Sequence, residues 1–158
     1  MREAKGSARG WAAAFAFAAV LAAAAAGGVV FWRTQEAAVG ARLFSGVTPL
    51  GGRIVGHEED LPSQASRCAN CHLTSAAADS SGGLSASTQR FGPALTAALL
   101  KEAISCRHGP PSRYDKASFC TLLRTGVDPV QVVLPRSMPR YAVNAKQCAA
   151  LWAHVTAQ

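Results

Sequence analysis

Five consecutive residues, Cys68-Ala69-Asn70-Cys71-His72, constrain this chain more than any other part of its sequence. Two thiols three positions apart can lie on one side of a single turn of chain, and the histidine follows the second thiol directly. This C-x-x-C-H run is the attachment pattern of c-type haem, in which both thiols bond to one porphyrin and the imidazole ligates the iron. We therefore predict one covalent haem c, held by Cys68 and Cys71, with His72 as an iron ligand.

Two other kinds of site also use a C-x-x-C pair. A zinc site needs two further ligands, for which Cys106 and His108 can be proposed, but the sequence has no second C-x-x-C pair. A thioredoxin-like dithiol needs alternating strands and helices around the motif, whereas this neighbourhood is rich in Ala, Gly and Ser. The sequence favours haem attachment over both.

A low-spin electron carrier needs a second axial ligand, because six fixed ligands keep the iron geometry similar in both oxidation states. Met138 is the one methionine besides the initiator, and Pro135 and Pro139 bracket it. Two prolines stiffen a loop and can hold a thioether toward the iron. We predict Met138 as the second iron ligand.

The other histidines have ordinary explanations. His57 lies in an acidic, solvent-like segment, and His108 precedes a Gly-Pro-Pro turn. His154 is expected in the last helix, on the side away from its apolar stripe. None of the three competes well with Met138 as an iron ligand.

Residues 11–32 form an uncharged run of apolar and small residues, with basic residues on both sides. A helix of this length can cross a hydrocarbon core of roughly 30 Å. The aromatic and basic residues Trp32 and Arg33 at its end favour an uncleaved inner-membrane anchor, and a cleaved signal peptide, which would leave a soluble periplasmic domain, is the alternative. We predict a signal-anchor segment over residues 1–33, with a cytoplasmic N-terminus, and a periplasmic domain over residues 34–158.

The chain is basic, with 16 Lys and Arg against 9 Asp and Glu. These charges do not cluster or alternate with aromatic residues, so nucleic acid is a poor candidate for a partner. A basic surface instead favours docking to the acidic surface of another protein.

Two helices have clear sequence signals. Asn144 with Gln147 predicts a capped helix start, flanked by Val143 and Cys148 as a hydrophobic staple. Its apolar stripe must bury against another element and consists of Cys148, Leu151, Trp152 and Val155. An earlier helix is predicted between the cap Asp115 and the stop Gly126, with an inward face of Phe119, Leu122 and Leu123. A further helix is predicted to start at Pro93, with Leu95 and Leu99 on one face.

The order of landmarks resembles class I, mitochondrial-type cytochrome c, especially bacterial single-haem domains. It runs from a short helix with Gly40 and Leu43-Phe44, through C-x-x-C-H and Gly92-Pro93, to Met138-Pro139 and a final helix, over about residues 37–157. The resemblance implies a mainly α fold of 3–5 helices around one haem. It also implies that Pro93 presents its carbonyl to His72, and that the first helix, around Val39 and Leu43, packs on the last.

The chain departs from this family in two loops. Residues 45–62 look like an insertion, either an ordinary surface loop or a small hairpin or flap. A second long loop spans residues 108–114. Its residues Arg113 and Tyr114, or alternatively Arg124 and Arg140, could bond a haem propionate.

Three cysteines remain after haem attachment, namely Cys106, Cys120 and Cys148. An oxidising compartment favours one disulfide. Because Cys120 and Cys148 each lie near a helix start beside an inward face, we favour a bridge between them, and Cys106 to Cys120 is the competing pair.

Electron transfer without bound substrate is the function that these features predict, with redox proteins as donor and acceptor. The cytochrome subunit of a membrane-associated dehydrogenase and a haem-based ligand sensor are the alternatives. A haem enzyme such as a peroxidase needs an open iron position, which Met138 would fill, so we do not expect an enzyme.

Overall fold

The computed structural model describes residues 8–73, 92–105 and 109–157. Cys106 and His108, and the basic residues Arg2 and Lys5, lie outside these ranges. The chain divides into two units, residues 1–35 and residues 36–158. Across the described residues, no helix combines the length and hydropathy needed to cross a membrane. The membrane anchor over residues 11–32 stays a prediction.

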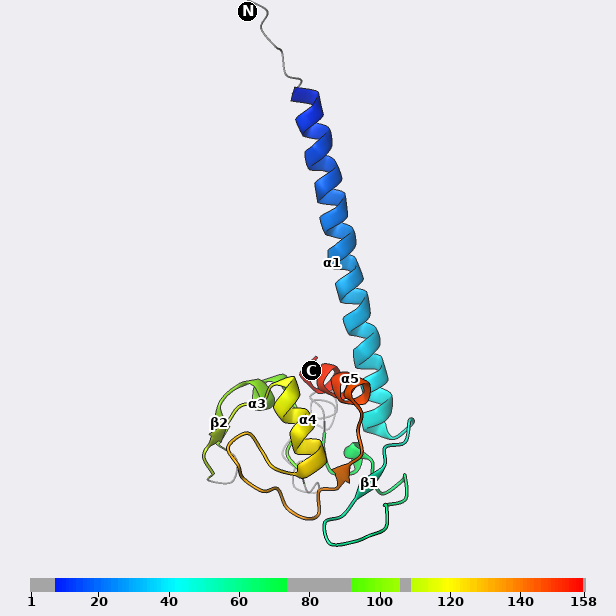
Figure 1. The fold of residues 1–158 in the computed structure, drawn as a ribbon, viewed down its shortest axis with the longest axis vertical. Coiled ribbons are helices and arrows are strands. Elements are labelled where there is room, and N and C mark those ends of the chain that lie inside the picture. The colour runs from blue at the N-terminus through cyan, green and yellow to red at the C-terminus, as the bar shows by residue number, and fades with distance from the viewer. Residues whose placement is uncertain (1–7, 74–91, 106–108, 158) are drawn as a thin grey trace, which may run out of the picture. The chain divides into compact units, whose positions relative to one another are not determined.

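Helices dominate the described residues, and each strand has two residues (Figure 1). The mainly α class is therefore confirmed. In chain order the elements are α1 (Ala8–Ser45), β1 (Gly52–Arg53), η1 (Cys68–Asn70, a single 3-10 turn), α3 (Ala97–Lys101), β2 (Ile104–Ser105), β3 (Pro111–Ser112), α4 (Lys116–Thr125), β4 (Arg140–Tyr141) and α5 (Ala145–Thr156). The strands form two antiparallel pairs, β1 with β4 and β2 with β3.

The predicted caps of α4 and α5 are confirmed. Asp115 and Ser118 form a capping box, with the Ser118 N–H donating to Asp115 Oδ1 at 2.7 Å. Asn144 and Gln147 form a second box, with the Gln147 N–H donating to Asn144 Oδ1 at 2.9 Å. Gly126 ends α4 with a φ of 72°, a left-handed conformation that glycine adopts at little cost. Short-range contacts within each helix thus define where both helices begin.

The core of unit 36–158 lies where α4, α5 and the last residues of α1 meet. Cys148, Leu151 and Val155 of the predicted α5 stripe are buried, and the inward face of α4 is buried as predicted. On α1, Leu43 is buried but Val39 is exposed. The close contact is made instead by Gly40, since a Cβ atom there would overlap the Ala150 carbonyl of α5.

Two sequence predictions were wrong in detail. Pro93 does not start α3, because Thr96 caps that helix by accepting from the Leu99 N–H at 3.1 Å, while residues 92–95 are held alongside residues 71–73. His154 does not face away from the packed side of its helix, since its ring lies 5.3 Å from that of Phe44. For residues 45–62 the sequence allows a surface loop or a small hairpin or flap, and their one strand, β1, pairs with the distant β4.

The disulfide between Cys120 and Cys148 is confirmed, and it joins α4 to α5 over a sequence separation of 28. Replacing both cysteines by alanine should lower the free energy of unfolding by about 3–4 kcal/mol, because the bridge restricts the unfolded chain. Thermal melts with and without reducing agent check this. The reductant should lower the Tm of the parent protein and leave that of the variant unchanged, and equal Tm values for parent and variant would contradict the prediction.

Candidate cofactor-attachment site

The turn η1 begins at Cys68, the first cysteine of the C-x-x-C-H motif, and leads directly into Cys71 and His72. The Cys71 and His72 N–H groups both donate to the Cys68 carbonyl, at 3.1 and 2.9 Å. Asn70 Nδ2 holds the turn from outside by donating to the Gln64 carbonyl at 2.8 Å. The backbone thus places two thiols and one imidazole within a single turn.

Both cysteines of the turn are unpaired thiols, unlike Cys120 and Cys148. Cys68 is buried and belongs to the hydrophobic core cluster, and Cys71 is partly buried. Burial raises the pKa of Cys68 to about 11. Redox-active dithiols instead need a nucleophilic cysteine with a lowered pKa. The surroundings of Cys68 therefore do not suit a thioredoxin-like reaction.

His72 is oriented by the backbone of a second segment. Its Nδ1 lies 2.8 Å from the Pro93 carbonyl oxygen. Because that oxygen can only accept, Nδ1 carries the proton, and a neutral ring keeps the Nε2 lone pair for a metal. Burial lowers the pKa of His72, which favours the neutral ring. This contact is the one implied by the family resemblance.

The Pro93 carbonyl is itself held in place on both sides. The Gly92 N–H donates to the Cys71 carbonyl at 3.1 Å, and the Leu95 N–H donates to the Leu73 carbonyl at 2.7 Å. Gly92 also lies against the imidazole, where a Cβ atom would overlap the ring of His72. Sequence reasoning missed this role of Gly92, although the glycine before Pro93 was a visible signal.

Met138 lies on a short turn, in which its N–H donates to the Pro135 carbonyl at 3.1 Å. Its side chain is partly buried and packs against the hydrophobic core cluster. Cys68 belongs to this cluster, and Leu95 also packs against it. The structure therefore brings the predicted second ligand and the attachment turn to one apolar cluster. Of the rival histidines, His57 is exposed and His154 packs on Phe44.

Tyr141 is a further residue at the site that sequence reasoning missed. It is buried, and its hydroxyl lies 4.0 Å from Cys68 Sγ. Tyr141 belongs to β4, whose pairing with β1 matches Gly52 with Tyr141. Residues 45–62 thus reach the neighbourhood of Cys68 through this strand pair.

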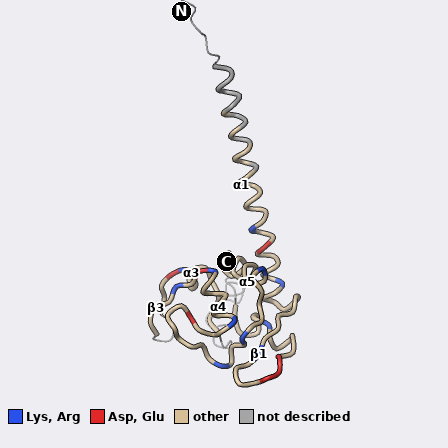
Figure 2. The backbone as a smooth tube through the Cα atoms, in the orientation of Figure 1, with Lys and Arg blue, Asp and Glu red and all other residues tan. Residues whose placement is uncertain are grey.

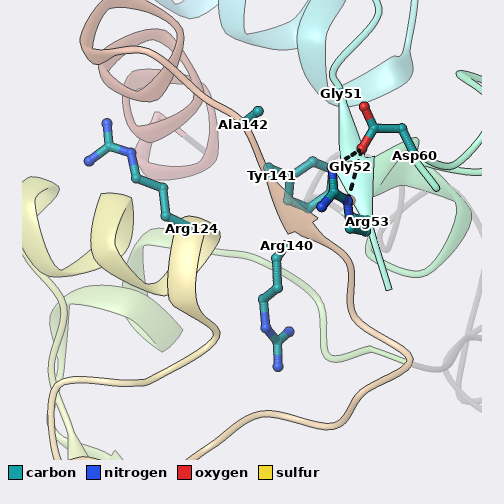
Figure 3. A pocket seen from close by; sticks show the side chains of 8 residues that line it. All are labelled: Gly51, Gly52, Arg53, Asp60, Arg124, Arg140, Tyr141 and Ala142. Carbon is teal, nitrogen blue, oxygen red and sulfur yellow. Dashed lines mark hydrogen bonds and ion pairs between the residues drawn. The ribbon is translucent and has the colours of Figure 1, made fainter. Parts of the chain in front are cut away.

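The predicted propionate-binding arginines are partly engaged elsewhere. Arg124 Nε donates to the Val143 carbonyl at 3.1 Å, and Arg113 is exposed. Arg124 and Arg140 border a pocket of about 240 Å³ beside β1 and β4. In Figure 3 the Arg140 guanidinium points away from the ion pair between Arg53 and Asp60, which are 3.2 Å apart.

Cys68, Cys71 and His72 fit the predicted cofactor, haem c. Two unpaired thiols and an oriented neutral imidazole are the donors that covalent haem attachment requires. In the parts of the chain that the structure describes, no three His, Cys, Asp or Glu side chains gather as a metal site.

Basic residues of unit 36–158 are scattered over several elements (Figure 2).

Comparison of the chain with protein-family models, with curated proteins and with solved structures finds no match.

Proposed function

We propose that this chain is a single-haem c-type cytochrome of class I that carries electrons. The observation that carries the proposal is the contact of 2.8 Å between His72 Nδ1 and the Pro93 carbonyl, directly beside two unpaired cysteines on the same turn. That contact fixes the imidazole tautomer and its orientation, as partners of metal-binding histidines do.

Each residue of the proposed site has a separate task. Cys68 and Cys71 would tether the cofactor through thioether bonds, and His72 and Met138 would be its iron ligands. Haem, when bound, supplies one-electron cycling between Fe(II) and Fe(III). The buried surroundings of Cys68 and the partial burial of Met138 would limit the access of water and, together with a thioether ligand, favour the ferrous state.

The proposed partners are redox proteins that give and take single electrons. A basic domain is suited to an acidic docking surface, and a membrane anchor over residues 11–32 would keep the domain beside membrane-bound partners on the periplasmic side. The cytochrome subunit of a dehydrogenase complex is one such setting.

Carbon monoxide binding to the reduced holoprotein tests this function. An electron carrier with both His72 and Met138 bound should show reversible one-electron reduction and almost no binding of carbon monoxide at neutral pH. Rapid stoichiometric binding would contradict the proposal, because it would indicate an open iron position of the kind that sensors and peroxidases use.

The contact of Gly92 with the imidazole provides a second test. Gly92→Ala should lower the fraction of chains that carry haem by about tenfold, because the new Cβ atom would displace the His72 ring from the Pro93 carbonyl. The ratio of haem to protein absorbance in purified material measures this fraction. Gly51→Ala is the matched control, since a Cβ atom at Gly51 would lie 3.9 Å from that of Ala142, an ordinary contact. Equal haem content in both variants would contradict the prediction.

A further inference from the structure

The turn that carries Met138 is fixed at both of its ends. Upstream, residues 126–134 fold back on themselves, with the Leu134 N–H donating to the Gly126 carbonyl at 2.8 Å. Downstream, the chain enters β4, where Arg140 pairs with Arg53 of β1. Between these anchors, the Met138 N–H donates to the Pro135 carbonyl, and residues 135–138 make no other backbone bond to the described residues. A further contact to this segment would restrict the turn that carries the thioether.

The side chain of Arg140 supplies that contact. Its Nη1 donates to the Met138 carbonyl at 2.6 Å and its Nη2 donates to the Leu134 carbonyl at 3.1 Å. Arg53, the cross-strand neighbour, is engaged with Asp60 instead, and Figure 3 shows the two arginine side chains diverging. One guanidinium thus joins the Met138 turn to Leu134, at the end of the segment 126–134 that folds back on itself.

Gly126 makes room for this arrangement. A Cβ atom at Gly126 would overlap the guanidinium carbon of Arg140, so the planar group lies directly against the glycine backbone. The planar guanidinium of arginine can donate to two carbonyls at once in a fixed geometry. The single ammonium of lysine does so much less well. Arg140 Nε is buried and has no partner among the described residues, so the guanidinium is held by its two outer nitrogens.

We propose that Arg140 is a positioning residue that clamps the Met138 turn and so keeps the thioether bound to the iron. This inference rests on the proposed ligation by Met138. Arg140 touches neither the iron nor a substrate, and it acts through the backbone of the residue that it holds. Replacing Arg140 should therefore make Met138 easier to displace from the iron.

Displacement of Met138 by imidazole in the oxidised, full-length holoprotein tests the clamp. Arg140→Lys and Arg140→Met should each bind imidazole about tenfold more tightly than the parent, because charge-assisted bonds that hold the turn are lost. The sulfur-to-iron charge-transfer band should also disappear at a lower imidazole concentration than in the parent. Arg136 provides the matched control, because it lies two residues before Met138, as Arg140 lies two after, and is exposed with no bond among the described residues. Arg136→Lys and Arg136→Met should stay within about twofold of the parent.

A second variant keeps the test decisive if changes at Arg140 prevent folding. Gly126→Ala retains the arginine and its charge but displaces the guanidinium, so imidazole should again bind more tightly. Imidazole affinities equal to that of the parent in the Arg140 variants, or in Gly126→Ala if those do not fold, would overturn the clamp while leaving the cytochrome intact. A parent protein without the sulfur band would instead overturn ligation by Met138 itself, and the clamp with it.

Discussion

Replacing Cys68 and Cys71 together by alanine is expected to abolish covalent haem attachment. The proposed tether consists of two thioether bonds from the unpaired thiols of Cys68, in η1, and Cys71, directly after it. Without them, the remaining links to the cofactor would be the coordinate bonds from His72 and Met138 to the iron. Denaturation breaks such bonds. Haem staining after denaturing electrophoresis measures the result, and the variant should retain less than about one hundredth of the parent signal, since no covalent bond remains.

The disulfide cysteines provide the matched control for this experiment. Changing Cys120 and Cys148 to alanine also removes two cysteines, but the pair forms a bridge between α4 and α5 and does not lie on the attachment turn. That variant should unfold more easily and still stain for haem. A Cys68 and Cys71 variant that stains like the parent would contradict the attachment.

Replacing Met138 by alanine is expected to open the sixth iron position and to lower the reduction potential by on the order of 100 mV, because axial-ligand identity sets haem potentials over about 0.8 V. A thioether stabilises ferrous iron, so its loss favours the ferric state. The variant should also bind carbon monoxide and imidazole, which the parent resists. Spectroelectrochemical titration and ligand titration check both effects.

A matched control separates ligation from packing. Leu95 is also partly buried against the hydrophobic cluster that contacts Met138, but its side chain has no atom that can bind iron. Leu95→Ala should therefore cost stability, by about 2–5 kcal/mol if its cavity does not collapse, and should change the potential little. An unchanged spectrum and potential in Met138→Ala would contradict the ligand assignment.

Local patterns predicted those parts of the fold that local chemistry determines. Both helix caps, at Asp115 and Asn144, depend on a side chain and an N–H three residues away, so the spacing of residue types is sufficient. The bridge between Cys120 and Cys148 followed from the inward faces of the same two helices. The turn with the C-x-x-C-H motif is similarly local, because Cys68, Cys71 and His72 lie within five residues.

Contacts between distant segments could not be predicted in this way. The pairing of β1 with β4 involves two residues on each strand, which is too short for an alternating pattern. Pro93 is a common first residue of a helix, but its backbone is held beside the attachment turn, so the helix starts later at the better cap, Thr96. The partial burial of His154 depends on Gly40, which lets two helices approach closely.

The mass of the intact, denatured protein, purified from a host that attaches haem to c-type cytochromes, tests the central claim most directly. We predict that the mass exceeds that of the polypeptide by one haem, and that alkylation under denaturing, non-reducing conditions leaves Cys68 and Cys71 unmodified. A mass equal to the bare polypeptide, with both thiols alkylated, would contradict the account.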